Sequence, residues 1–392
     1  MQTVRQKTIS IKTFEINIPE KVLDDLQDRL QNTRWIKPFK EEGWDSGTNI
    51  NYLKDLVNYW QNEFDWRKQE TALNKFHQFK VNIEDYHIHF IKEQGVGNDH
   101  DRIPLLMLHG WPDSFYRFNK IIPMLTERVN TDEEVNDSFD VIVPSLPGFG
   151  FTDCPLIKIP EQHLRHVAEL LYKLMTEVLG YNRFAIVGGD GGSPLAQLIA
   201  INHPESVIGI YLTDLGWHVS SIDHSLLNKK EKHYLEAGQK AFMKQGAYAM
   251  VQSTKPQTIS YNLNDSPVGL AAWIMDRFHF WCDGEIEDHF SKDELLTNIM
   301  IYWVTGNIAS PIRGYRLEIK SPSLTTSDYV NVPVGLGLFP KDIGGIPPRE
   351  FAERTLNVVH WKEMSRGGHF TAWEEPEAMV EDVRKFFGEL KK

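Results

Sequence analysis

Two hydrophobic periodicities divide the chain. Residues 19–34 and 52–66 place apolar side chains at helical spacing, as in Val22, Leu26 and Leu30. Such spacing predicts amphipathic helices. From about residue 76 the pattern changes to the alternation of apolar and polar positions that is typical of strands. The first 75 residues are therefore predicted to form a helical extension that packs against another domain.

The following segment alternates between strand-like and helix-like patterns. Short apolar runs predict strands at 104–110, 139–144, 183–188, 207–215, 332–340 and 358–364, after two antiparallel strands within 76–93. Helical stretches are expected at 115–128, 162–179, 193–202, 348–356 and 376–390. Strands that alternate with helices favour an α/β fold, here a mostly parallel eight-stranded sheet with helices on both faces.

The alternation stops between residues 216 and 325, where helix formers and aromatic residues dominate. An insertion of this length predicts a helical cap over the carboxyl ends of the strands, where open α/β sheets bind ligands. The expected organisation is an N-terminal extension at 1–75, a core at 76–215, a cap at 216–325 and the rest of the core at 326–392.

A glycine-rich turn between a predicted strand and a predicted helix carries the first candidate chemistry. Residues 184–193 read Phe-Ala-Ile-Val-Gly-Gly-Asp-Gly-Gly-Ser, the pattern of the nucleophile elbow of an α/β-hydrolase, with Asp190 at its tip. The four glycines provide the small residues that a strained elbow needs. The turn lacks the glycine spacing of a dinucleotide site and the lysine of a phosphate loop. A carboxylate that attacks carbon forms an ester, which suits opening a strained ring or displacing a leaving group.

His369 is the candidate base. It follows the last predicted strand, in Ser-Arg-Gly-Gly-His, as the hydrolase order of nucleophile, acid and histidine requires. An imidazole of near-neutral pKa can take a proton from water. Two carboxylates could orient it: Asp342, after the strand at 332–340, which we favour, and Asp214, after the strand that precedes the cap.

The segment Leu-Met-Leu-His-Gly-Trp-Pro-Asp-Ser at 106–114 is a candidate for part of an oxyanion site. It follows a strand at the position where a backbone N–H supplements the one after the nucleophile. The candidate donors are the N–H groups of Trp111 and Gly191. His109 in the same segment is expected to have a structural role.

Opening a ring requires a donor for the departing oxygen, and a phenol is neutral at pH 7 and can lie in an apolar cap. The residues alone do not choose among the tyrosines of the cap, which include Tyr248, Tyr261, Tyr302 and Tyr315.

Composition excludes several classes of protein. The chain has 392 residues, and 42 Lys and Arg against 54 Asp and Glu give a net charge of −12, which argues against a nucleic-acid surface. The N-terminal segment is polar and predicts neither a signal peptide nor a membrane span. No Cys/His cluster has zinc-ligand spacing. We therefore expect no metal, no cofactor and a cytoplasmic location.

Several segments together resemble the epoxide hydrolases, specifically the microsomal type and its soluble relatives, over nearly the whole chain. They are NTRW, HGWPDSFYRF, PSLPGFGFT, GGDGGS, TKPQT, LNDSPVGLAAWI, YWVTGNIASPIRGY, FPKD and RGGHFTAWEEPE. The resemblance implies hydrolysis of an epoxide to a vicinal diol without metal or cofactor. It implies Asp190 as nucleophile, His369 as base, Asp342 of FPKD as acid, and Tyr248 and Tyr315 as the donors. The sequence is compatible with a homodimer but does not predict one.

Two departures from that family shape the expectations. The residue after the nucleophile is usually tryptophan, but here it is Gly191, which should reshape the pocket. The membrane anchor of some members is missing, so the chain resembles the soluble branch. The alternatives are a haloalkane dehalogenase-like hydrolase, which would typically need that tryptophan, and a non-catalytic ligand-binding relative. We expect an apolar lining and a hydrophobic epoxide; candidate lining residues are Trp111, Phe149, Phe151, Trp273 and Phe280.

Overall fold

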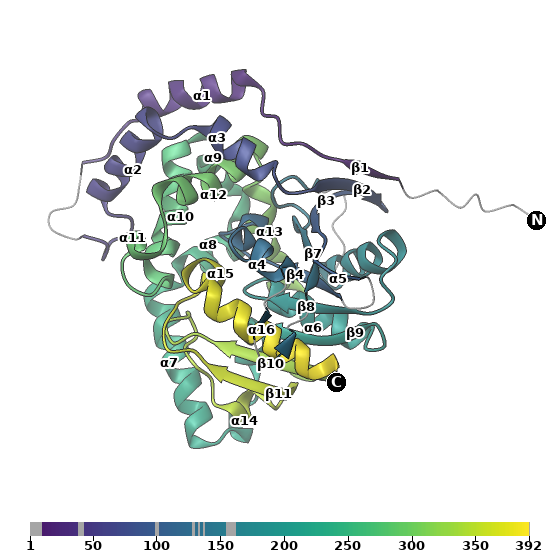
Figure 1. Ribbon diagram of the computed structural model, residues 1–392. Helices are drawn as coiled ribbons and strands as arrows, with labels where there is room; N and C mark the ends of the chain where they lie inside the picture. Colours follow the sequence, from purple (N-terminus) through teal and green to yellow (C-terminus); the bar gives the residue numbers. More distant parts are fainter. Residues whose placement is uncertain are drawn as a thin grey trace, which may run out of the picture.

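A twisted sheet of nine strands organises the molecule (Figure 1). The computed structural model describes residues 10–37, 43–98, 102–127, 130–131, 134–135, 138–153 and 162–391. The strands are β1 Ile11–Thr13, β2 Gln78–Ile83, β3 Tyr86–Glu93, β4 Ile103–Leu108, β7 Phe139–Pro144, β8 Phe184–Gly188, β9 Val207–Leu212, β10 Val330–Leu338 and β11 Leu356–Glu363. Their spatial order is β1-β2-β3-β7-β4-β8-β9-β10-β11. The last six strands in this order run parallel, and β1, β2 and β3 pair antiparallel. The α/β-hydrolase fold expected from the sequence is confirmed.

The sheet has one strand more than the eight expected. The extra strand, β1, lies in the N-terminal extension and pairs with β2, with Ile11 opposite Val81. All three residues of β1 are exposed, so its sequence carries no alternation that could predict it. Two further short strands, β5 Asn130–Thr131 and β6 Glu134–Val135, form a separate pair.

Alternate residues of the central strands enter two different cores. In β4, Leu105 and Met107 belong to one buried cluster, whereas Leu106 and Leu108 belong to the other. Strands buried on both faces read as continuous apolar runs, and this is why β4 shows no alternation in its sequence. Helices α4 and α16 cover the first face, and α5 and α6 cover the second.

The covering helices largely follow the predicted ranges. They are α4 Ile121–Thr126, α5 His163–Lys173, α6 Gly192–Asn202, α14 Arg349–Ala352, α15 Thr371–Glu374 and α16 Pro376–Lys391. The helix expected at 115–128 is two shorter pieces, the 3₁₀ turn η1 Phe115–Phe118 and then α4. The helix expected at 162–179 continues after α5 as a π-helical turn, η2 Leu174–Val178.

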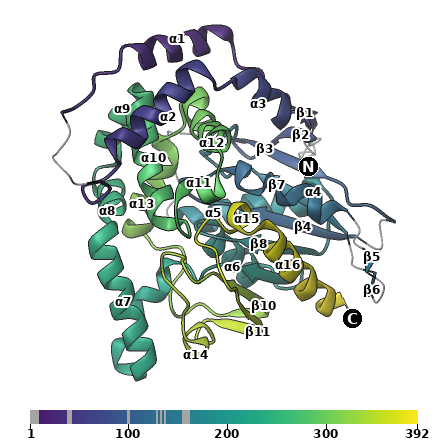
Figure 2. The ribbon, with the colours of Figure 1, turned by 60° about the vertical axis from the view of Figure 1, so that its left-hand side comes forward.

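The segment between β9 and β10 is helical and gathers on one side of the sheet (Figures 1 and 2). After the 3₁₀ turns η3 Trp217–Ser221 and η4 His224–Leu226 come α7 Lys229–Gln245, α8 Ala247–Thr254, α9 Pro256–Asp265, α10 Pro267–Trp281, α11 Ile286–His289, α12 Lys292–Thr305 and α13 Ala309–Lys320. Helix α12 contacts the loop after β4, where the Asn298 amide donates to the carbonyl oxygen of Pro112 at 2.9 Å. The cap therefore touches the carboxyl ends of the parallel strands.

The N-terminal extension arches over the cap helices α9, α10 and α12 in both views (Figures 1 and 2). It contains α1 Glu20–Gln31, α2 Ile50–Asn62 and α3 Trp66–Leu73. Polar contacts join the extension to the cap: Arg29 pairs with Asp265 at 2.9 Å, and the Tyr59 hydroxyl donates to Asp293 at 3.0 Å. In the part of the chain that the structure describes, no helix combines the length and apolar character needed to cross a membrane.

Candidate active site

Asp190 stands at the sharp turn between β8 and α6. Its backbone φ is +54°, a left-handed conformation that is uncommon for residues other than glycine. The turn is crowded: a Cβ at Gly188, Gly189 or Gly192 would lie 2.6, 2.5 and 2.0 Å, respectively, from a neighbouring heavy atom. These three positions therefore require glycine.

Gly191 differs from the other three glycines of the elbow. Its φ is −59°, and the nearest heavy atom to an added Cβ is the Cα of Gly110 at 3.4 Å. Neither the backbone nor the space around that Cβ demands glycine. The expectation that all four glycines serve the elbow's geometry is corrected for this position.

The two carboxylate oxygens of Asp190 have different partners. Oδ1 accepts the backbone N–H groups of Trp111 at 2.9 Å and Gly191 at 2.6 Å, so the two predicted oxyanion donors converge on one oxygen. Oδ2 lies 3.3 Å from Nε2 of His369. Burial alone would raise the pKa of Asp190, but His369 and the two N–H groups hold it below its usual value. Asp190 is thus an anion with one oxygen held and the other facing the histidine.

His369 is held on three sides. Its Nδ1 lies 2.7 Å from Oδ1 of Asp342, its backbone N–H donates to the carbonyl of Trp281 at 2.7 Å, and its carbonyl accepts from Arg117 at 2.6 Å. Burial lowers the pKa of His369, but the negative charges of Asp342 and Asp190 outweigh it and raise the pKa to about 10. The imidazole of this state is therefore protonated and paired with both carboxylates.

Of the two candidate acids, only Asp342 is placed on the ring of His369. Asp214 lies behind the elbow instead, where it accepts the backbone N–H of Asp190 at 2.7 Å and the hydroxyl of Ser193 at 2.9 Å. The alternative in which Asp214 orients the imidazole does not match this arrangement.

The two predicted tyrosines lie in an aromatic cluster beside Asp190. The ring of Tyr248 on α8 stacks on Trp111 at 5.4 Å, and Tyr315 on α13 meets the same indole edge-on at 6.1 Å. Trp281 of α10 joins the cluster and packs edge-on against His369 at 5.1 Å. Burial, and then the charge of Asp190, raise the pKa of Tyr248 above its usual range. The hydroxyl groups of Tyr248 and Tyr315 interact with each other.

The other candidate tyrosines have different surroundings. Tyr261 is exposed, and the hydroxyl of Tyr302 donates to the carbonyl oxygen of Asp113 at 2.5 Å. His109 is also committed to the fold. Its Nε2 accepts the N–H of Leu146 at 3.2 Å, and burial lowers its pKa to about 3.

Of the five candidate lining residues, only Trp111 lies in the aromatic cluster. Phe149 packs edge-on against His109, and Phe151 packs on His89. The Trp273 indole N–H donates to Gln252 at 3.0 Å, and Phe280 packs on His279. Trp281 is the member of the aromatic cluster that the sequence interpretation missed, because its place at the end of a long apolar helix is typical of a core residue.

Three charged residues near the site were also missed. Asp113 and Arg117 form a buried ion pair that joins the loop after β4 to the loop that carries His369, because Asp113 accepts the N–H of Gly110 and Arg117 donates to the carbonyl oxygen of His369. Arg277 lies over the ring of Tyr248 at 4.8 Å. The four-residue spacing of Asp113 and Arg117 was the available signal.

Within the described ranges, no group of three or more His, Cys, Asp or Glu side chains is arranged to hold a metal ion. The groups gathered at the site are carboxylates, an imidazole, phenols, indoles and backbone N–H groups.

The fold and this geometry define a class of protein: an α/β-hydrolase with an aspartate at the nucleophile elbow and a helical cap. The family described as "Epoxide hydrolase N terminus" matches residues 11–118, and "alpha/beta hydrolase fold" matches residues 103–242. The chain is 38% identical to epoxide hydrolase 1 of Sus scrofa, over 97% of this chain and 89% of the pig protein. The chain belongs to the epoxide hydrolase family and is an enzyme, a hydrolase.

Solved structures agree with this assignment. The juvenile hormone epoxide hydrolase of the silkworm Bombyx mori superposes with a TM-score of 0.87 at 28% identity, covering 97% of this chain and 95% of that one. The Aspergillus niger epoxide hydrolase gives a TM-score of 0.83 at 30% identity, covering 97% of each chain. The resemblance inferred from the sequence motifs is confirmed.

Proposed function

We propose that this enzyme converts a hydrophobic epoxide to a vicinal diol through an ester on Asp190. The observation that carries the proposal is that the two oxygens of Asp190 have different partners. Oδ1 accepts two N–H groups, and Oδ2 lies 3.3 Å from Nε2 of His369. A carboxylate that is anionic and fixed on one side can attack carbon with its other oxygen.

In the first step, Oδ2 of Asp190 attacks one ring carbon and the bond from that carbon to the ring oxygen breaks. The departing oxygen takes a proton from the hydroxyl of Tyr248 or Tyr315, which supply neutral donors from the cap. The position of Tyr248 supports this role, since its buried hydroxyl lies beside that of Tyr315 and the charge of Asp190 acts on both. The product of the step is a hydroxyalkyl ester.

Ester formation then prepares the base. The charge of Asp190 contributes to the raised pKa of His369, and an ester carries no charge. The pKa of His369 therefore falls when the ester forms, and its imidazole can lose a proton to the tyrosine that donated one. Asp342 remains to orient the neutral ring through Nδ1.

In the second step, His369 deprotonates a water molecule that attacks Cγ of the ester. Negative charge develops on Oδ1, where the N–H groups of Trp111 and Gly191 already converge. The bond between Cγ and Oδ2 breaks, the diol leaves with Oδ2, and the oxygen from water stays in the carboxylate of Asp190. His369 gives that proton to the departing alkoxide and then takes the second proton of the water from the Asp190 carboxyl group, which restores the ion pair of the resting site.

The aromatic side chains beside Asp190 support a class of substrate. Trp111, Tyr248, Tyr315 and Trp281 present aromatic faces and edges beside Asp190, and such surfaces favour an apolar, particularly an aryl, epoxide.

Trapping the ester tests the proposal. The variant His369→Gln lacks the base, so incubation with styrene oxide should add the mass of one substrate to the peptide that contains Asp190. The double variant His369→Gln, Asp190→Asn is the matched control and should gain no mass. Tight binding of the epoxide with neither adduct nor diol would contradict the proposal and favour a ligand-binding relative.

A further inference from the structure

Asp214 follows β9 by two residues and contacts the elbow that carries Asp190. Three donors converge on its half-buried carboxylate. Oδ2 accepts the backbone N–H of Asp190 at 2.7 Å and the hydroxyl of Ser193 at 2.9 Å, and Oδ1 accepts the backbone N–H of Gly216 at 2.9 Å. Asp214 thus contacts the backbone of the nucleophile, not the imidazole.

The backbone of Asp190 needs such a partner. A residue with a side chain held at φ +54° is strained and persists only when its surroundings fix it. The neighbouring N–H of Gly191 is one of the two donors to Oδ1 of Asp190. A shift of the Asp190 backbone would therefore move the attacking oxygen and an oxyanion donor together.

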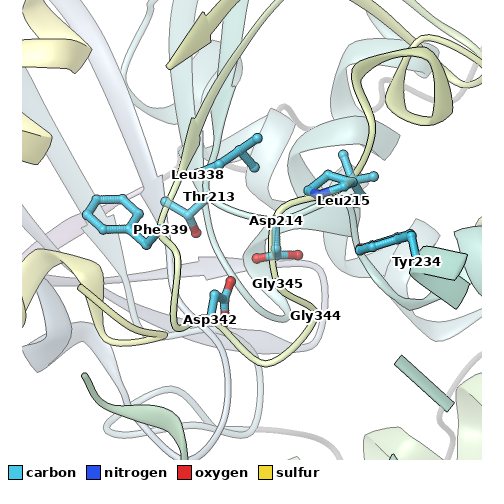
Figure 3. Close-up of a pocket in the computed structure, with 10 residues that line it drawn as sticks. Thr213, Asp214, Leu215, Tyr234, Leu338, Phe339, Asp342, Gly344 and Gly345 are labelled. Carbon is cyan, nitrogen blue, oxygen red and sulfur yellow. The ribbon is translucent and has the colours of Figure 1, made fainter. Parts of the chain in front are cut away.

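Asp214 and Asp342 line one cavity of about 30 Å³, together with Thr213 and Tyr234 (Figure 3). A cavity of this size can hold a water molecule when polar groups line it. Desolvation, and then the charges of Asp342 and Asp190, raise the pKa of Asp214 to about 6. The charge of Asp342 thus disfavours the ionised form of Asp214, although the two carboxylates hold different parts of the site.

We propose that Asp214 is a positioning residue for the nucleophile: it fixes the backbone N–H of Asp190, whereas Asp342 serves the base alone. This inference rests on the ester mechanism proposed above. It follows that the loss of each carboxylate should affect the rates of the two chemical steps differently. Loss of Asp214 should slow ester formation and ester hydrolysis together, because both depend on the elbow. Loss of Asp342 should slow only hydrolysis.

The side-chain chemistry predicts an order among the variants. In Asp214→Asn the amide oxygen can still accept from Asp190 or from Gly216, but its NH₂ group then opposes the other N–H. Asp214→Ala keeps neither contact. Displacing reacting groups by about 1 Å can cost roughly 100-fold in rate. We therefore expect ester formation to slow about 10-fold in Asp214→Asn and about 100-fold in Asp214→Ala.

Single-turnover kinetics with styrene oxide and an excess of enzyme test the inference. The ester and the diol are quantified after acid quench, and denaturant titration checks that each variant is folded. Ser193→Ala is the matched control. It removes one donor to Asp214 but leaves the bond to Asp190, so ester formation should change less than about threefold.

Two results together support the inference. Ester formation should be slower in both Asp214 variants, more so in Asp214→Ala than in Asp214→Asn, and it should be normal in Asp342→Asn. Wild-type ester formation in correctly folded Asp214→Asn overturns it while leaving the proposed function intact, as does slowing confined to hydrolysis, which would make Asp214 a partner of the base. Absence of any ester in the wild type and in His369→Gln overturns the proposed function and this inference together.

Discussion

Replacing Asp342 by asparagine should remove the charge beside the base and keep its geometry. Oδ1 of Asp342 accepts both Nδ1–H of His369 at 2.7 Å and the backbone N–H of Ile343 at 2.7 Å. Because two donors point at this one oxygen, the amide oxygen of asparagine should take its place and the NH₂ group should face away. The imidazole then keeps its orientation and tautomer but loses its anionic partner.

The size of the effect follows from the burial of the pair. The side chains of His369 and Asp342 are 4% and 10% exposed, so solvent screens their interaction little. A hydrogen bond to a charged group contributes about 1.5–3 kcal/mol, against about 0.5–1.5 kcal/mol for a neutral one. The difference of about 1–2 kcal/mol corresponds to a slowing of roughly 5- to 30-fold. It should fall on ester hydrolysis, in which His369 gains positive charge.

Stopped-flow tryptophan fluorescence can resolve the two steps, because Trp111 and Trp281 lie in the aromatic cluster at the site. In Asp342→Asn the ester should form at the wild-type rate and accumulate, so that kcat and KM fall together and kcat/KM stays constant. Equal slowing of formation and hydrolysis would refute the assignment of Asp342 to the base alone. Unchanged hydrolysis would refute its role as partner of His369.

Three further outcomes are expected. Gly191→Ala should keep kcat/KM within about threefold, because the φ of Gly191 is −59° and the added Cβ would make an ordinary contact, 3.4 Å from the Cα of Gly110. A Cβ at Gly192 would instead lie 2.0 Å from a backbone oxygen. Urea titration and steady-state kinetics compare Gly191→Ala with Gly192→Ala, and equal losses of stability and activity would contradict this geometry. Tyr248→Phe should slow ester formation roughly 10- to 100-fold and leave ester hydrolysis nearly unchanged, and an unaltered burst phase would exclude the hydroxyl as a donor. The pKa of His369 is raised above its ordinary value to about 10, so its pairing with the carboxylates stabilises the fold fully below about pH 6.5, and this stabilisation is lost as pH rises toward 10. NMR titration should show a lower pKa of His369 in Asp190→Asn. A pKa that stays near 10 in that variant would contradict the proposed fall of the pKa when the ester forms.

The fold was predictable where hydrophobic periodicity controls it. Strands such as β4 are apolar on both sides because Leu105 and Leu106 enter opposite cores, and the helices between them have one apolar face. Strand β1 was not predictable, because its three residues are exposed and it is defined by pairing with β2. Short-range breaks, such as the division of the helix at 115–128, depend on local packing that periodicity does not record.

The candidate site was predictable where chain order and turn chemistry constrain it. Asp190, His369 and the two N–H donors come together as their motifs indicate. Strand order alone left Asp214 as an alternative to Asp342, because both residues follow strands. The FPKD motif indicated Asp342, and the path of the loop after β10 brings its carboxylate to the imidazole.

The tyrosines could not be separated from their neighbours by periodicity either, since Tyr302 is as buried as Tyr248. Family motifs singled out Tyr248 and Tyr315, and the structure places both in the aromatic cluster. Contacts between distant segments, such as Arg277 over Tyr248, leave no local signal in the chain.

The origin of the oxygen added to the product tests the central claim most directly. One turnover with excess enzyme in ¹⁸O-labelled water should give unlabelled diol and place the heavy atom in the carboxylate of Asp190, as mass spectrometry of the diol and of the peptide would show. Label that enters the diol in that first turnover would mean that water attacks the epoxide directly, and it would contradict an ester on Asp190.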